Sequence, residues 1–193
     1  MAENTPTKLK LPKLVDLVSS NLEEIYKNEL LNQYLSQSPP ASWIKTHPYI
    51  KNYKYLPIDK IELLLRKIFK RYKIEVLKTG MLLNAVETSV RVHFYHPIFE
   101  EWNYHDGVGA CEVQTKSQTG SLMLDMSNIS PGAISMALPI AKTMAVKDAC
   151  DHFGPLFGSD INRKDTVEFK PDQELEKKAS KAHTDKIEKL LAI

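Results

Sequence analysis

The chain has 193 residues, with 26 Lys or Arg against 24 Asp or Glu, and its formal net charge is +2. This length favours one domain with short tails, and the apolar content is sufficient for a packed core. No apolar run approaches the roughly 20 residues of a membrane helix, and the N-terminus lacks the apolar core of a signal peptide. The two cysteines, Cys111 and Cys150, have no framework spacing. We therefore expect a protein of a reducing, cytoplasmic compartment that does not span a membrane.

The N-terminal part of the sequence predicts a flexible start followed by a helix. Residues 1–9 are polar, and we expect them to be flexible. From Leu11 to about Leu35, apolar residues recur at helical spacing. This apolar stripe has two possible uses, which are burial in the core of the same chain and contact with a neighbouring subunit. Prolines and serines in residues 36–42 then predict a turn.

Residues 43–55 alternate aromatic and cationic side chains. Such an alternation suits a groove for single-stranded nucleic acid, because rings stack on bases at roughly 1–3 kcal/mol each while lysines neutralise phosphates. The other interpretation is a loop whose tyrosines cover the core while its lysines are solvated. Both interpretations stay open from this segment alone.

A second helix is predicted from Pro57 to Tyr72. Its apolar residues fall on one side and its basic residues on or near the other. Asp59 and Glu62 in the first turn, with cations in the last, agree with the helix dipole.

Three strands are predicted next, over residues 73–83, 85–95 and 102–115, with residues 96–101 as a connection. The middle strand alternates clearly, and one of its faces is formed by Val86, Thr88, Val90, Val92 and Phe94. Gly107 and Gly109 in the third strand indicate either a bulge or a close approach of another backbone. We expect an antiparallel meander.

The stretch from Ser135 to Gly158 predicts a helix with a seam of small residues. Alanine recurs there at every fourth position, namely at Ala137, Ala141, Ala145 and Ala149. Small side chains let a helix approach a sheet closely. Ser135 is the expected N-cap, Pro139 falls in or near the first turn, and Gly154 with Pro155 ends the helix after Phe153.

These elements together predict an α+β fold, in which an antiparallel meander of three or more strands packs against the alanine-rich helix. A helical N-terminal segment precedes the meander. Residues 10–170 are expected to form a single core domain, and residues 171–193 a charged C-terminal helix or a flexible tail.

The sequence contains neither a Walker loop nor a GxGxxG motif, so no nucleotide cofactor is expected. His93 and His96 are close in sequence but have no obvious third metal ligand. One enzymatic alternative uses Asp106, Glu112 and Lys116, which lie on or beside one predicted strand, as in some Mg²⁺-dependent nucleases. Another alternative is a non-enzymatic interaction module, whose first helix and C-terminal tail bind protein partners.

Three stretches follow one another in the sequence: YLPIDKIELLLRKIF, TSVRVHFYHPIFEEWNYHDGVGACEV and IAKTMAVKDACDHFGPLFG. Their order resembles the single-strand annealing proteins of the Rad-fifty-two superfamily, especially its phage branch of Sak-like recombinases, with RecT, Redβ and Erf as more distant relatives. The matching family patterns are x-V-R-V-x at residues 89–93, a return strand at residues 104–109, and F-G-x-x-x-G at residues 153–158. The resemblance covers roughly residues 43–164, although the connection 116–132 is longer than in the eukaryotic member.

The resemblance implies ATP-independent binding of single-stranded DNA and annealing of complementary strands in recombination. Family members form rings or helical filaments with a positively charged groove along the outer rim. Residue by residue, Lys45 or His47 matches a groove cation, Tyr55 a groove aromatic, and Lys147 a cation of the alanine-rich helix. No catalytic residue, cofactor or metal ion is implied.

Asp148 and Asp151 depart from the basic run that the family has on this helix, and Lys142 can compensate for them. The predicted DNA-binding set is Lys45, His47, Lys51, Lys54, Tyr55, Arg91, Lys142, Lys147, Arg163 and Lys164. The partners implied are single-stranded DNA, the annealed duplex intermediate and further copies of the chain, with a single-strand-binding protein or an exonuclease as additional candidates. The implied location is the cytoplasm of a bacterium or of a phage-infected host.

Overall fold

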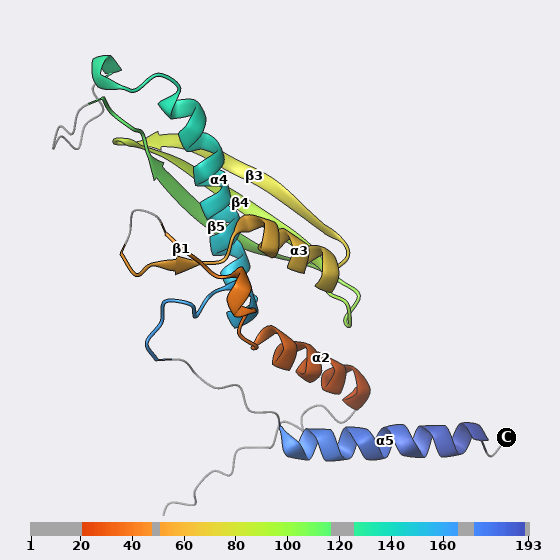
Figure 1. Cartoon of the computed structure of the whole chain (residues 1–193). Helices are drawn as coiled ribbons and strands as arrows, with labels where there is room; N and C mark the ends of the chain where they lie inside the picture. The colour runs from red at the N-terminus through yellow and green to blue at the C-terminus, as the bar shows by residue number, and fades with distance from the viewer. Residues whose placement is uncertain (1–20, 48–50, 117–125, 166–171, 192–193) are drawn as a thin grey trace, which may run out of the picture. The chain divides into compact units, whose positions relative to one another are not determined.

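The computed structural model describes residues 21–47, 51–116, 126–165 and 172–191 (Figure 1). By its contacts the chain forms two compact units, one of Tyr34–Glu168 and one that combines Met1–Gln33 with Phe169–Ile193. The elements in chain order are α2 (Leu22–Leu35), η1 (Ala41–Trp43), β1 (Lys45–Thr46), β2 (Lys54–Tyr55), α3 (Ile58–Ile68), β3 (Tyr72–Leu82), β4 (Ala85–Tyr95), β5 (Trp102–Glu112), η2 (Met126–Asn128), α4 (Ala133–Asp151), η3 (Pro155–Phe157) and α5 (Gln173–Leu191).

The larger unit contains a three-stranded antiparallel sheet in the order β3-β4-β5, and α4 packs across β4 and β5. The predicted α+β class, with such a sheet packed against helices, is confirmed. The central strand β4 has the predicted bounds, and of its two predicted faces the buried one is that of Val86, Thr88, Val90, Val92 and Phe94. The other two strands begin or end a few residues away from the prediction.

Glycine and alanine bring the backbones of β5 and α4 close together. A Cβ atom at Gly107 would lie 2.8 Å from the Cβ atom of Ala149 and would overlap backbone atoms of Ala145 and Ala149. A Cβ atom at Gly109 would overlap backbone atoms of Ala141 and Ala145 in the same way. Pairing between β4 and β5 continues without a register shift through both glycines. Of the two predicted alternatives, a close backbone approach is therefore the one observed, and the bulge is not.

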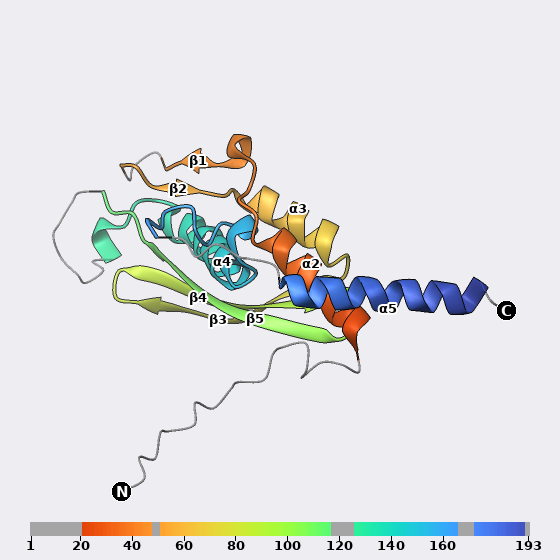
Figure 2. The same ribbon diagram turned by 90° about the horizontal axis from the view of Figure 1, so that it is seen from below.

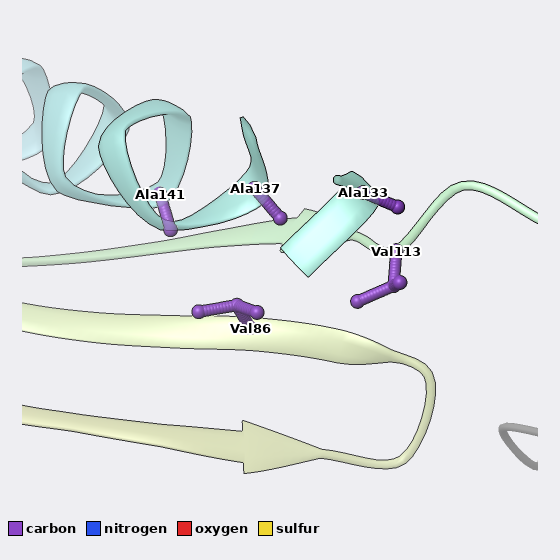
Figure 3. Close-up of a cluster of buried hydrophobic side chains, with 5 residues drawn as sticks. All are labelled: Val86, Val113, Ala133, Ala137 and Ala141. Carbon is purple, nitrogen blue, oxygen red and sulfur yellow. The ribbon is translucent and has the colours of Figure 1, made fainter. Parts of the chain in front are cut away.

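The first half of α4 contributes its alanines to one cluster of the core (Figure 3). The buried members are Val86, Val113, Ala133, Ala137 and Ala141. Ala141 is completely buried. Because alanine carries only a methyl group, the space between helix and sheet is filled from the sheet side by valine.

The start of α4 differs from the prediction. The helix begins at Ala133, after Gly132 in the left-handed conformation with φ of 75°, so Ser135 is not its N-cap. Glycine adopts this conformation without steric cost, which makes Gly132 the residue that turns the chain into the helix. Pro139 consequently lies inside the helix rather than in its first turn. The helix ends at Asp151, and η3 follows Gly154, whose φ is 107°.

The second predicted helix is shorter than expected. Helix α3 starts after Pro57 and ends at Ile68, and Tyr72 already belongs to β3. Lys70 has a φ of 58°, which is a left-handed conformation that no helix can continue through. Phe69 then packs against Phe94 at 4.9 Å between ring centroids, so the end of α3 is fixed by the core.

The other unit contains α5 and nearly all of α2, while residues 1–20 lie outside the described part of the chain. Glu23 bonds Lys27 at 2.9 Å and Lys186 of α5 at 3.1 Å. Asp172 accepts hydrogen bonds from the backbone N–H groups at the start of α5 and so caps it. Within the predicted range of residues 171–193, the described residues Gln173–Leu191 form α5. None of the helices among the described residues combines the length and apolar character that crossing a bilayer requires.

Candidate nucleic-acid interface

A short β-hairpin lies on the side of α4 that faces away from the sheet. Strand β1 pairs with β2 through Lys45 opposite Tyr55 and Thr46 opposite Lys54, and the N–H of His47 donates to the carbonyl of Tyr53 at 2.7 Å. Figure 2 shows α4 between this hairpin and the three-stranded sheet. The hairpin therefore places the alternating aromatic and cationic residues of the sequence next to α4.

A first cavity, here named the aromatic cavity, lies between the hairpin and α4. Its volume is about 460 Å³, and its lining consists of His47, Tyr53, Tyr55, Pro139, Ile140, Thr143, Met144 and Lys147. The ammonium of Lys147 lies 4.6 Å from the centre of the Tyr55 ring, within the range of a cation–π contact. Burial lowers the pKa of Lys147, while the carboxylates of Asp151 and Asp59 act in the opposite direction.

A second cavity, here named the cationic cavity, lies beside the same hairpin. Its volume is about 560 Å³, and it is lined by Thr46, Lys51, Asn52, Tyr53, Lys54, Ile161, Asn162 and Arg163. The side chain of Asn162 holds this cavity together, because its Oδ1 accepts from the Lys54 N–H at 2.9 Å and its Nδ2 donates to the Lys54 carbonyl at 2.7 Å. The Asn162 amide thus makes the two hydrogen bonds to the Lys54 backbone that a neighbouring strand would make, and it thereby places Arg163 beside Lys54.

A smaller hollow joins the two cavities. It shares Tyr53, Lys54 and Asn162 with the cationic cavity, and Tyr53, Tyr55 and Lys147 with the aromatic cavity. We name the three together the hairpin groove. Asp151 also lines this hollow, and burial together with the nearby Asp148 carboxylate raises its pKa to about 6.

The structure brings six of the predicted residues together in the hairpin groove, which are His47, Lys51, Lys54, Tyr55, Lys147 and Arg163. Lys45 lies on the same hairpin, opposite Tyr55, and is exposed. Lys164 follows Arg163 in the chain and is also exposed. Lys142 on α4 does not line either cavity.

Arg91 lies elsewhere, on the face of the sheet that α4 leaves open. Its guanidinium donates to both carboxylate oxygens of Asp106, at 2.7 and 2.8 Å, and lies 3.9 Å from the centre of the Tyr104 ring. The hydrogen bond to Asp106 raises the pKa of Arg91, and the same bond lowers the pKa of Asp106. Nearby, Glu75 accepts a hydrogen bond from Nε2 of His93 at 2.9 Å. Arg91 is therefore paired within the sheet and does not reach the groove.

The residues of the nuclease alternative are not assembled into one site. Asp106 and Glu112 are six residues apart on one strand, which corresponds to about 20 Å. The ammonium of Lys116 donates to the carbonyl of Ser127 at 3.2 Å. Among the described residues, no group of three or more His, Cys, Asp or Glu side chains could hold a metal ion together.

Asp148, one of the two acidic departures on the alanine-rich helix, has a structural role. Its carboxylate accepts the backbone N–H of Val108 at 2.9 Å. Among the described residues β5 pairs only with β4, and Asp148 supplies the acceptor for this N–H group of the edge strand. The acidic residue therefore belongs to the contact between α4 and β5.

Asn162 and the apolar wall of α4 are among the parts of the groove that the sequence did not predict. Asn162 is 108 residues away from Lys54 in the chain, and no local pattern marks such a contact. Ile140 and Met144 were detectable, since they lie off the alanine seam of a helix and yet are apolar.

No protein-family model matches the chain, and no curated protein matches it either.

Proposed function

We propose that this protein binds single-stranded DNA in the hairpin groove and anneals complementary strands without ATP, as a homo-oligomeric recombination protein. One observation carries the proposal. Six residues that the sequence marked as DNA-binding, drawn from the hairpin, from α4 and from the segment after η3, line one continuous groove.

The chemistry of the groove supports a single strand as its ligand. Lys51, Lys54 and Arg163 line one cavity, where cations neutralise phosphates. Tyr53 and Tyr55 line the adjoining cavity, where rings stack on bases without regard to sequence. A duplex would keep its bases inside and would leave the tyrosines without a partner.

Annealing requires that a bound strand keeps most base edges accessible to its complement. A groove that holds the backbone mainly through cations meets this requirement. Several copies of the chain, each with few cations, hold one strand tightly because each further contact is intramolecular. The net charge of +2 is compatible with this, since only the groove must be positive.

The proposal is tested by removing two cations from the cationic cavity. The double variant Lys54→Ala/Arg163→Ala is expected to bind oligo(dT) about tenfold less tightly, and its log–log salt slope should decrease by about 1.4, or 0.7 for each lost phosphate contact. The matched control is Arg66→Ala/Lys67→Ala, which removes the same charge from exposed positions at the end of α3. An equal loss in the control variant would contradict a role for the groove.

Annealing itself is measured with labelled complementary strands in the absence of ATP. The wild-type protein is expected to accelerate duplex formation, and the groove variant is expected to do so more slowly. Particle imaging with and without single-stranded DNA tests for a ring or filament. Labelled DNA incubated with Mg²⁺ and the protein should stay intact, and cleavage would favour the nuclease alternative instead.

A further inference from the structure

We infer that the aromatic cavity is a nucleobase site, into which one base of the bound strand turns for each subunit. The inference rests on the proposed function and deepens it. The cationic cavity and the hollow beside it hold backbone, whereas the aromatic cavity holds a base whose ring is enclosed on two sides.

The walls of the aromatic cavity match the two faces of a flat ring. Tyr53 and Tyr55 come from the hairpin, and Ile140 and Met144 come from α4 on the opposite wall. Ile140 is 44% exposed and Met144 is 49% exposed, so two large apolar side chains of one helix lie at the surface beside a cavity. Aromatic rings stack on bases, and methionine sulfur makes favourable contacts with rings.

The size of the aromatic cavity also suits this ligand. Its volume of about 460 Å³ falls within the range of about 300–1,000 Å³ that small-molecule sites occupy. The cavity is mostly apolar, and the polar side chains in its lining include His47, Thr143 and Lys147. A few polar groups in an apolar cavity orient a ring without holding a phosphate.

The neighbouring positive charges favour a base of a nucleic-acid strand over a free apolar molecule as the ligand of the aromatic cavity. Tyr53 lines both the aromatic and the cationic cavity, so a strand whose phosphates lie near Lys54 and Arg163 passes the mouth of the aromatic cavity. The polyanion is attracted by these cations, and its base is then delivered to the adjacent apolar walls.

Lys147 gives the site a preference among bases. Its ammonium donates hydrogen bonds and accepts none. Thymine, cytosine and guanine offer a carbonyl oxygen to such a donor, whereas adenine offers only ring nitrogens, which are weaker acceptors for an ammonium. Adenine tracts are therefore expected to use the site less well than thymine tracts.

The experiment compares oligo(dT) with an abasic strand of the same length and the same number of phosphates. Wild-type protein is expected to bind oligo(dT) about tenfold more tightly than the abasic strand. Met144→Ala should lose most of this preference, while its affinity for the abasic strand and its salt slope stay as in the wild type. Oligo(dA) should lie between the two strands.

The matched control is Met136→Ala, which truncates a methionine of the same helix that is 66% exposed and outside the cavity. Tyr53→Leu is a second variant, which keeps an apolar side chain but removes the stacking ring. An unchanged preference for bases in both Met144→Ala and Tyr53→Leu would overturn the base site, while salt-dependent binding would leave the proposed function standing. Failure of the wild type to bind either strand would overturn both.

Discussion

The two long sides of α4 differ in what they require of their residues. On the side toward the sheet, Ala141, Ala145 and Ala149 lie against a strand that carries glycines, and the backbones themselves are in contact. On the side toward the hairpin, Ile140, Met144 and Lys147 line an open cavity. One side of α4 thus leaves no room for an added Cβ atom at Gly107 or Gly109 of the strand it contacts, whereas the other side lines an open cavity.

This difference separates residues that hold the fold from residues available for binding. A contact between backbones leaves no side chain that could move away, so its geometry is fixed. The cavity side has no such constraint, and its apolar residues are exposed although a solvated helix surface would favour polar ones. We therefore expect that each side of α4 can be altered without affecting the other.

The largest effect is expected on the sheet side, from Gly107→Ala. The added Cβ atom would overlap backbone atoms of Ala145 and Ala149, which can only be relieved by moving α4 away from the sheet. We expect a loss of about 3 kcal/mol or more in the free energy of unfolding, at the upper end of overpacking effects. Thermal and urea unfolding measure it.

A control for this variant is available in the same sheet. A Cβ atom at Gly80 of β3 would meet only the flexible side chain of Glu87, at 3.3 Å from its Oε1 atom. Gly80→Ala should therefore change stability far less than Gly107→Ala. Equal losses in the two variants would show that glycine matters there for a reason other than the contact with α4.

The next effect is expected on the hairpin side, where two lysines of α4 can be compared. Lys147 lines the aromatic cavity over the Tyr55 ring, whereas Lys142 lines neither cavity. Lys147→Ala should weaken binding of single-stranded DNA about tenfold, with the thermal midpoint nearly unchanged. Lys142→Ala should bind like the wild type, and a loss as large as that of Lys147→Ala would move the DNA path to another side of the helix.

How far the sequence predicts this molecule depends on whether a feature is local. The alternation of Val90 and Val92 with polar neighbours and the four-residue period of alanine are local, and they predicted both the middle strand and the helix side that contacts the sheet. The start of α4 was missed because Gly132, rather than a side-chain cap, turns the chain into the helix. The division between Tyr34–Glu168 and the remaining unit was not predicted, and the single core domain over residues 10–170 stays a prediction.

In the candidate site, too, local features were predicted and contacts between distant segments were not. The hairpin residues and Lys147 were marked from composition and from the family resemblance, and the groove brings them together. Arg91 was also predicted to bind DNA. The alternation of a strand does not by itself tell which face of the sheet a residue occupies, and the partner of Arg91, Asp106, comes from a neighbouring strand. Asn162 could not be found, since its partner is the backbone of a distant segment.

A smaller effect is expected from Asn162→Ala, which removes no charge. The variant loses both hydrogen bonds to the backbone of Lys54, so Arg163 is no longer held beside the hairpin. We expect a few-fold weaker binding of oligo(dT) and a loss of about 1–2 kcal/mol in the free energy of unfolding. Asn103→Ala is the control, because that amide bonds an exposed carboxylate of Glu101 at 3.1 Å and lies away from the groove. Normal binding by Asn162→Ala would show that the two hydrogen bonds to the Lys54 backbone do not position Arg163 for DNA.

The smallest effect is expected from pH, through Asp151 in the hollow that joins the two cavities. Its pKa is raised to about 6, so the carboxyl is mostly charged at pH 7.5 and mostly neutral at pH 5. Loss of this negative charge leaves Lys147 and Arg163 less compensated, so binding of single-stranded DNA should strengthen a few-fold as pH falls through 6. His152 and Asp148 also face this carboxyl, and Asp151→Asn isolates its share of the pH dependence.

Asp151→Asn should bind at pH 7.5 as the wild type binds near pH 5.5, and the difference between the two proteins should vanish at the lower pH.

The free energy of unfolding also depends on the protonation of Asp151. A carboxyl whose folded pKa lies above its unfolded value binds its proton more readily in the folded state, so stability decreases as pH rises from about 4 to about 6. Asp151→Asn should remove this decrease. The loss of unfolding free energy caused by Gly107→Ala should be the same at both pH values, because that residue lies on the side of α4 toward the sheet. A pH dependence of binding that persists unchanged in Asp151→Asn would assign it to another group of the hairpin side.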